Sequence, residues 1–192
     1  MIQAQAERHL TLTTLLEDLR RDGVLSDEEY QSGLSIRRNS GEESLHPVTI
    51  LARQNFKHQI TAKALNEDAL MSWLAAKNEL PHVTIDPLEI DVTSVTAQMS
   101  YAFSERHKIL AVNVSKDEVV VATAEPFVSG WITDLEHTTR RQISRVLAAP
   151  SDIERFRVEF YQLANSVNRA GQAHSGISSV QNLESMLIPL CA

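Results

Sequence analysis

The chain has little of several things, and each shortage excludes a class of protein. Cys191 is the only cysteine among 192 residues, so the chain can form no internal disulfide, which fits a reducing cytosol. None of its six glycines is followed by lysine, which excludes a phosphate loop of the form G-x-x-x-x-G-K-[ST]. There is no signal-peptide apolar region and no run of 18 apolar residues. We therefore expect no direct insertion into a membrane.

Positive charge is also scarce. The formal net charge is −7, and no block of five like charges occurs. A general nucleic-acid binder or a polybasic membrane patch needs the opposite balance, so we expect neither. The hydrophobic fraction of 43% is ordinary for a globular protein and is enough to fill a core.

Metal and cofactor motifs are absent as well. The seven histidines form no H-E-x-x-H motif, and one cysteine is too few for a structural zinc site. Asp86, Glu89 and Asp91 could offer oxygen ligands to a hard cation, but their spacing lacks the EF-hand pattern and its glycine. The simpler interpretation is that Asp86 organises a turn with Pro87. We predict no metal and no cofactor.

The first 60 residues read as a helical subdomain. Leucines recur at helical spacing from Leu12 to Leu19, and Gly23 suits a helix C-terminus. Ser26 and Glu29 have the spacing of a capping box that starts a second helix. Pro47 is suited to the first turn of a third helix, which we expect to run to Gln54.

The following residues, 65–170, alternate helical and strand patterns and predict an α+β domain. Its last helix, 151–168, begins with a capping box of Ser151 and Glu154, and Arg157 pairs with Glu154 on the solvent side. Residues 171–192 read as a flexible linker and tail. The expected elements are helix 66–80, strand 83–85, helix 99–108, a hairpin of 109–114 and 118–123, helix 129–139, strand 143–148 and helix 151–168.

Two polar constellations invite a catalytic interpretation. Ser104 and His107 are one helical turn apart with Glu105 between them, but no nucleophile elbow surrounds the serine. A polar helix end is favoured, in which Arg106, His107 and Lys108 complement the helix dipole. Glu125, before Pro126 at a strand end, is the other polar site of interest, and a loop that ends the hairpin is its favoured explanation. A small hydrolase would need a pocket that joins Ser104 or Cys191 to a histidine.

Three blocks of sequence, in order, carry a resemblance to a known family. They are Ile85-Asp-Pro-Leu-Glu-Ile-Asp91, Met99-Ser-Tyr-Ala-Phe-Ser-Glu-Arg-His-Lys108 and Val119-Val-Val-Ala-Thr-Ala-Glu-Pro126. Together with Glu159-Phe-Tyr-Gln-Leu-Ala164 they resemble the N-terminal domain of the traffic ATPases of type II secretion and type IV pilus assembly, the general secretion pathway protein E-like family. The similarity runs from about Leu65 to Ala170.

The resemblance implies a fold and a role. The fold is a small α/β sandwich with about three strands covered by helices. The role is docking of the motor, in the cytoplasm, onto the cytoplasmic part of an inner-membrane assembly-platform protein, with no catalysis by this chain because the ATPase domain and phosphate loop are absent. As partner-binding residues we predict the charged groups outside the apolar patterns, namely Asp86, Glu89, Asp91, Glu105, Arg106, His107 and Lys108. The choice between secretion and pilus assembly stays open, as does the oligomeric state.

The alternative function is a regulatory domain that binds a nucleotide second messenger such as a cyclic dinucleotide. Some relatives do this through an Arg-Leu-Gly motif. Alignment on Gly23 places Thr14-Leu-Leu16 at that motif, so the arginine and the glycine are both missing. A pair of arginines presented in a pocket would favour this alternative.

Overall fold

The computed structural model describes residues 7–37 and 44–184, with the side chains of the last helix described through 167 and at 169. Within these residues there are eight helices and one three-stranded sheet, so the predicted α+β class is confirmed. The helices are α1 (Leu12–Arg21), α2 (Asp27–Leu34), α3 (Pro47–Ala52), α4 (Glu67–Lys77), α5 (Val92–Thr96), α6 (Tyr101–His107), α7 (Trp131–Thr139) and α8 (Pro150–Glu184). The strands are β1 (Ile109–Val114), β2 (Glu118–Thr123) and β3 (Gln142–Leu147).

The helical N-terminal part forms as its leucine pattern predicts. Leu15, Leu16 and Leu19 of α1 are fully buried. The capping box at the start of α2 is confirmed, because Ser26 Oγ accepts the Glu29 N–H and the Glu29 carboxylate accepts the Ser26 N–H. Pro47 occupies the first turn of α3, where its missing N–H leaves no hydrogen bond unmade.

The sheet has the order β1-β2-β3. The predicted hairpin is confirmed: β1 and β2 are antiparallel, with an irregularity between Ala111 and Asn113. The chain then passes through α7 and returns as β3, parallel to β2. The predicted strand 83–85 is reduced to a bridge between His82 and Leu147, because Leu147 is the last residue of β3 and the chain enters α8 at Pro150, which leaves residues 83–85 without a strand to pair with. There, Val83 N–H donates to the Leu147 carbonyl over 2.9 Å, and Leu147 N–H donates to the Pro81 carbonyl over 2.8 Å.

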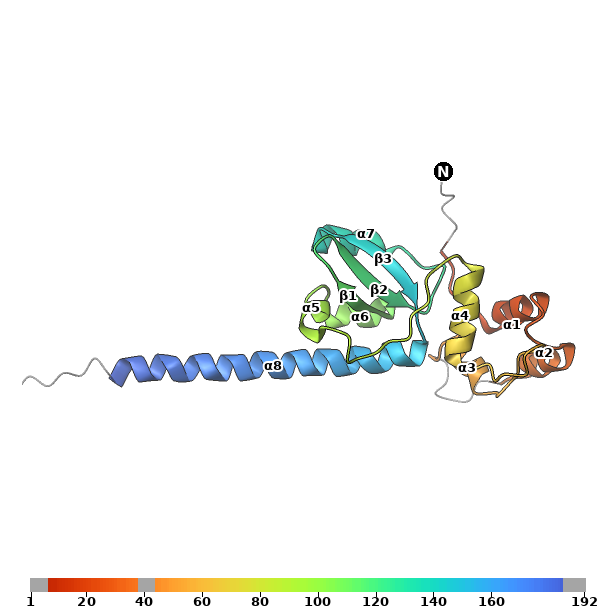
Figure 1. The fold of residues 1–192 in the computed structure, drawn as a ribbon, viewed down its shortest axis with the longest axis horizontal. Helices are drawn as coiled ribbons and strands as arrows, with labels where there is room; N and C mark the ends of the chain where they lie inside the picture. The colour runs from red at the N-terminus through yellow and green to blue at the C-terminus, as the bar shows by residue number, and fades with distance from the viewer. Residues whose placement is uncertain (1–6, 38–43, 185–192) are drawn as a thin grey trace, which may run out of the picture.

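Helices cover the sheet as a sandwich predicts. Figure 1 shows α8 running along one side of the sheet, next to α5 and α6, with α7 on the opposite side. The helices α1 to α4 lie together at the end of the molecule from which α8 starts. Buried residues of both parts, from Leu10 in the N-terminal segment to Phe160 in α8, form one contiguous hydrophobic cluster. The division into separate domains therefore stays a prediction.

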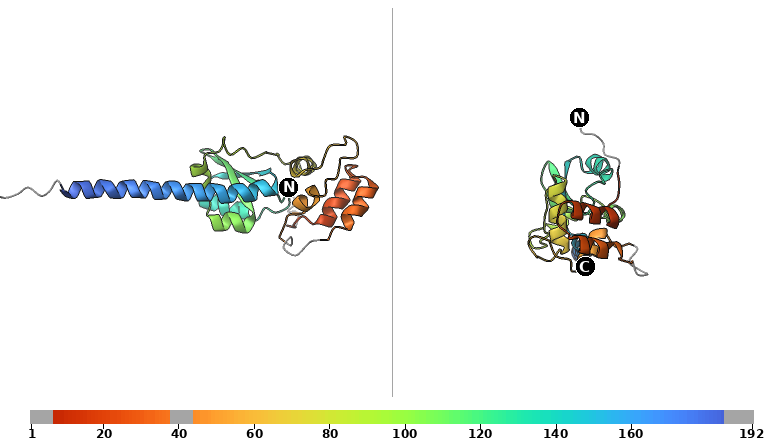
Figure 2. Two further views of the ribbon diagram at one scale, coloured as in Figure 1. Left: turned by 90° about the horizontal axis from the view of Figure 1, so that it is seen from below. Right: turned by 90° about the vertical axis from the view of Figure 1, so that its right-hand side faces the viewer.

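The last helix differs from its prediction at both ends. It continues to Glu184, through the residues expected to form a linker, and extends well beyond the body of the molecule in two perpendicular views (Figures 1 and 2). Gly171 and Gly176 each lower helix propensity by only about 1 kcal/mol, and no proline interrupts the helix after Pro150. Its 35 residues span about 50 Å at 1.5 Å per residue.

The predicted capping box of Ser151 and Glu154 is wrong. Ser151 lies inside the first turn of α8, and both its N–H (3.1 Å) and its hydroxyl (2.6 Å) donate to Glu67 Oε2. Glu67 is the first residue of α4, 84 positions earlier in the chain. A distant carboxylate thus replaces the local cap, and it joins the starts of two helices.

We predict that Glu67→Ala lowers the free energy of unfolding by about 1–2 kcal/mol, because two donors at the start of α8 lose a charged acceptor. Chemical denaturation measures this. Glu17→Ala, which removes an exposed glutamate of α1, is the control, and we expect it to change stability by less than about 0.5 kcal/mol. Equal stability of the two variants would contradict the structural importance of this cap.

Candidate functional site

A cavity of about 820 Å³ lies where the helical part meets the α/β part. The N-terminal segment, the residues around α3, the end of α6, the loop after β2 and the start of α8 all contribute to its wall. The wall carries five arginine or lysine side chains against three glutamates, although the chain as a whole is acidic. The cavity therefore concentrates positive charge on an acidic protein.

The N-terminal segment is fixed to the α/β part by Glu7. Its Oε1 accepts the backbone N–H of Ser129 over 2.9 Å and also that of Gly130. Gly130 precedes α7 and has no side chain with which to cap that helix. Glu7 therefore places a negative charge just before the N-terminus of α7 from more than a hundred residues away, and the adjacent Arg8 guanidinium lies 4.4 Å from the centre of the Phe127 ring.

Glu125 is the second anchor of this segment. Its Oε2 accepts the Leu10 N–H over 2.9 Å, and its Oε1 lies 3.3 Å from His9 Nδ1. His46 Nε2, from the residue that precedes α3, is 3.6 Å from the same Oε1. Burial alone raises the pKa of the Glu125 carboxyl, but the facing His46 and the Leu10 N–H outweigh burial, and the pKa is lowered. The carboxylate is therefore the stable form, and it ties together three segments.

Arg157 of α8 is the most unusual group of the cavity wall. Its side chain is only 3% exposed, and its Nε and Nη1 have no hydrogen-bond partner among the described residues. Its acidic neighbour is Glu154, with Arg157 Nη2 and Glu154 Oε1 3.9 Å apart. The predicted pair of Arg157 with Glu154 is confirmed, but the predicted position of Arg157 on the solvent side is wrong. It lies one helical turn after buried Ile153 and next to buried Phe156, so the stripe of α8 carries it inward.

The end of α6 forms another part of the wall, with Arg106, His107 and Lys108. Lys108 ends the helix in the left-handed conformation, with φ of 54°. The His107 ring packs on Phe103 at 4.5 Å between centroids, and burial, helped by Arg106, lowers the His107 pKa. Glu105, which does not line the cavity, is exposed and accepts a hydrogen bond from the Tyr101 hydroxyl at 3.3 Å.

Ser104 does not have the surroundings of a nucleophile. It is fully buried, and its hydroxyl donates to the Ile109 carbonyl. The hydroxyl thus satisfies the backbone where α6 turns into β1, and no histidine is its partner in the described part of the chain. Cys191, the other nucleophile considered, lies outside the described residues.

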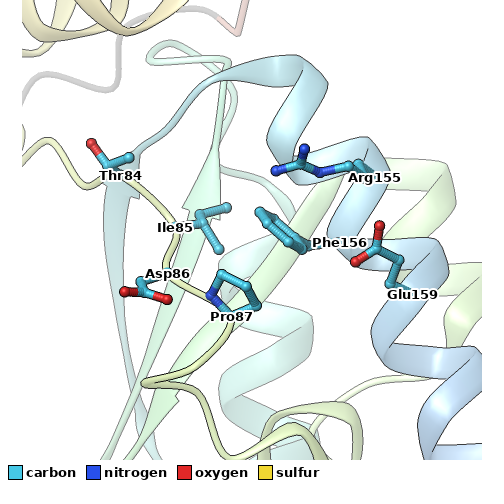
Figure 3. Close-up of a pocket in the computed structure, with 7 residues that line it drawn as sticks. All are labelled: Thr84, Ile85, Asp86, Pro87, Arg155, Phe156 and Glu159. Carbon is cyan, nitrogen blue, oxygen red and sulfur yellow. The ribbon is translucent and has the colours of Figure 1, made fainter.

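The residues from Asp86 to Asp91 form a turn that borders a second pocket of about 500 Å³, which Figure 3 shows. Asp86 Oδ1 accepts the Leu88 N–H over 2.9 Å, which confirms its role in the turn. Asp91 caps α5, where its hydrogen bonds with Ser94 lower its pKa. Arg155, Phe156 and Glu159 of α8 face the turn across the pocket (Figure 3). No group of three potential metal ligands occurs among residues 7–37 and 44–184.

The structure therefore separates the two predicted groups of site residues. Arg106, His107 and Lys108 line the cavity, whereas Asp86 lines the other pocket, and Arg155 borders both. The sequence analysis noted Glu125 but missed His46 and Arg157 as site residues. An arginine within the apolar stripe of the last helix was the available signal for Arg157.

Comparisons with known proteins agree with this fold. Residues 78–167 match the model of the MshEN domain. The "Type IV pilus assembly ATPase TfpB" of Acinetobacter baylyi (strain ATCC 33305 / BD413 / ADP1) is 33% identical over 174 residues, which are 90% of this chain and 30% of that protein. The chain thus spans less than a third of the length of this curated relative.

Two solved structures are similar as well. A structure of MshE with cdg has a TM-score of 0.52 at 17% identity and covers 79% of this chain and 99% of its own. The N-terminal domain of XpsE has a TM-score of 0.48 at 17% identity and covers 78% and 96%. In the described part of the chain, none of the helices combines the length and the apolar character that crossing a membrane needs.

We predict that Glu125→Gln weakens the attachment of residues 9 and 10 and lowers the free energy of unfolding by about 1–2 kcal/mol at neutral pH. The native Glu125 pKa lies below its unfolded value, so ionisation stabilises the fold above that unfolded value, ordinarily about 4.3. As pH falls through the lowered pKa, this stabilisation disappears. Denaturation of both proteins across the acidic range should therefore show converging stabilities, and a constant difference would contradict the assignment.

Proposed function

This chain carries an MshEN domain and is homologous to a type IV pilus assembly ATPase, and from that premise we propose that it is a protein-docking module of a type II secretion or pilus assembly motor. Its partner is the cytoplasmic part of the inner-membrane assembly platform. The chain resides in the cytoplasm and reaches the membrane through that partner. It does no chemistry itself: the burial of the Ser104 hydroxyl supports this, since the only serine proposed as a nucleophile serves the backbone.

The observation that carries the docking proposal is the exposed turn. Leu88 is 92% exposed, more than any other large hydrophobic side chain of the described residues. Asp86, Glu89 and Asp91 surround it in sequence, and all three are exposed. An apolar tip within a charged rim is the arrangement that protein interfaces use, with the apolar centre supplying affinity and the rim supplying orientation.

The turn is held in shape before any partner binds. The Asp86 side chain accepts the Leu88 N–H, and the Asp86 backbone carbonyl accepts the Glu89 N–H over 3.2 Å. At the other end, Asp91 accepts the N–H and the hydroxyl of Ser94 over 3.2 and 2.6 Å. Little conformational entropy remains to be lost on binding, which favours a docking surface. Because the rim is acidic, we expect an apolar pocket with basic neighbours on the platform.

Glu105, Arg106, His107 and Lys108 are the second part of the proposed surface. Glu105, Arg106 and Lys108 are exposed at the end of α6. Since three of the four residues also line the cavity, their contribution to docking is tested separately from that of the turn. Charge reversal at Glu105, which lies outside the cavity wall, serves that purpose.

Binding of a nucleotide second messenger is the second candidate function. The structure of MshE with cdg suggests a ligand for that relative, and arginines that line a cavity in this chain favour an anionic ligand. The segment aligned with the Arg-Leu-Gly motif does not favour it, because Leu15 and Leu16 are buried in the core. The charged groups that such a ligand needs lie in the cavity and not in the segment Thr14–Leu16.

We predict that Leu88→Ser weakens binding to the cytoplasmic domain of the platform protein by about tenfold or more, as loss of an interface anchor does. Calorimetric titration against the platform domains of the host's secretion and pilus systems measures this. The melting temperature should not change, because Leu88 is 92% exposed and its replacement therefore removes little packing from the fold.

Ile60→Ser is the matched control, since Ile60 is 82% exposed in a different loop. It should bind like the unaltered chain. Glu105→Lys tests the second surface in the same titration. If no platform domain binds the chain, docking is the wrong function. If the chain binds but Leu88→Ser binds equally well, the turn is the wrong surface.

A further inference from the structure

We propose that the docking partner inserts an arginine side chain into the pocket between the docking turn and α8, and that Glu159 of α8 is the acceptor of its guanidinium. This pocket, shown in Figure 3, is called the groove below. The inference rests on the docking function proposed above, and it names the chemistry of the partner. Leu88 projects from the turn toward the partner, whereas the groove receives a group from it, so the two contacts are reciprocal.

The floor of the groove is apolar and fixed in place. Ile85 and Phe156 line it and are only 6% and 4% exposed, so the core of the protein holds both side chains. Pro87 is exposed on the turn, and its ring leaves the backbone little freedom. Surfaces that are already rigid lose little conformational entropy when a partner binds. The groove can therefore accept the apolar stem of a long side chain without rearranging.

Glu159 is a charged group of the groove that has no partner in the described part of the chain. It is exposed on α8, and neither an ion pair nor a side-chain hydrogen bond joins it to another described residue. Arg155, four positions earlier on the same helix, is the residue that would ordinarily pair with it. The Arg155 guanidinium is engaged elsewhere, because its Nη2 lies 3.0 Å from Asp152 Oδ1 and its central carbon lies 4.2 Å from the centre of the Phe156 ring. The groove thus has a satisfied cation and an unsatisfied carboxylate.

A second carboxylate lies on the facing wall. Asp86 lines the groove from the turn, and its Oδ1 accepts the Leu88 N–H over 2.9 Å. A carboxylate has further acceptor sites, so Asp86 can keep the turn in shape and still accept a donor from a partner. Since Asp152 offsets the charge of Arg155, the groove as a whole attracts a cation.

Arginine fits this arrangement better than lysine does. Its guanidinium is a planar group with donors on several sides, so it can bind acceptors on both walls at once, whereas a lysine ammonium is a compact, strongly hydrated charge. Arginine is also enriched at protein interfaces, from which lysine is depleted. An arginine whose stem lies on Phe156 and Pro87 brings its guanidinium between the walls that carry Glu159 and Asp86. The docking surface then includes α8 as well as the turn, which fixes the orientation of the partner.

The test is calorimetric titration of the full chain with the platform domains of the host's secretion and pilus systems. Glu159→Gln removes the charge but keeps the size of the side chain, and we expect it to weaken binding by about tenfold or more, as loss of one charge-assisted pair does. Its melting temperature should equal that of the unaltered chain, because Glu159 is exposed and has no partner among the described residues. Glu136→Gln is the matched control. It makes the same charge change at an exposed position of α7, on the opposite side of the sheet from α8, and should bind like the unaltered chain.

Replacement of each surface arginine of the platform domain by alanine identifies the group in the groove. In a double-mutant cycle, the arginine that enters the groove should lose most of its contribution when it is titrated against Glu159→Gln. If no platform domain binds the chain, docking is the wrong function and the groove contact falls with it. If a domain binds and Leu88→Ser weakens binding, but Glu159→Gln binds as tightly as Glu136→Gln, docking stands and the groove contact is wrong. Coupling of Glu159 to a lysine, or to no basic residue, overturns the assignment of arginine.

Discussion

The carboxylate of Glu125 is the interaction on which the arrangement of the two parts depends. It extends from the loop after β2 and holds the Leu10 N–H, His9 and His46, so one side chain joins the sheet to the first residues of the chain and to the start of α3. With Glu7 bonded to the N–H groups just before α7, residues 7–10 are fixed to the α/β part at two points. The helical part consequently cannot move as an independent unit without breaking charged hydrogen bonds in a partly buried setting, where each is worth more than at the surface.

Local elements were predictable because they depend on neighbouring residues. The β-branched runs around Ser115 gave the hairpin, and Ser26 with Glu29 gave a cap that the structure reproduces. Contacts between distant residues were not predictable. Ser151 and Glu154 have the spacing of the same cap, yet Glu67 takes the place of Glu154 because α4 starts beside α8. Spacing shows which local bond is available, but tertiary packing decides whether a better acceptor is near.

The candidate site shows the same limit. Sequence reasoning selected charged residues that lie outside apolar patterns, and this gave Asp86, Glu89 and the end of α6 as candidates. The same rule placed Arg157 on the solvent side, because a charged residue with a glutamate three positions earlier normally forms a surface pair. The apolar face of the helix decides instead, because Ile153, Phe156 and Phe160 are buried in the core. Residue 157 lies on the same face of the helix as residues 153 and 160, so it is buried with them. Spacing alone does not show that an arginine is buried with two nitrogens that lack hydrogen-bond partners among the described residues.

The two sites meet at the first turns of α8. Phe156 faces the turn of Asp86 and Pro87 in the smaller pocket, whereas its neighbour Arg157 lines the cavity, and Arg155 borders both. Consecutive helical residues point about 100° apart, so one rigid turn of helix serves both sites. Glu67 fixes the start of that turn, and the Tyr161 hydroxyl, which donates to the Met99 carbonyl over 2.7 Å, fixes the following one. The side chains of this turn therefore cannot reorient locally without strain. Any coupling between the cavity and the docking turn would have to come from a shift of α8 as a whole.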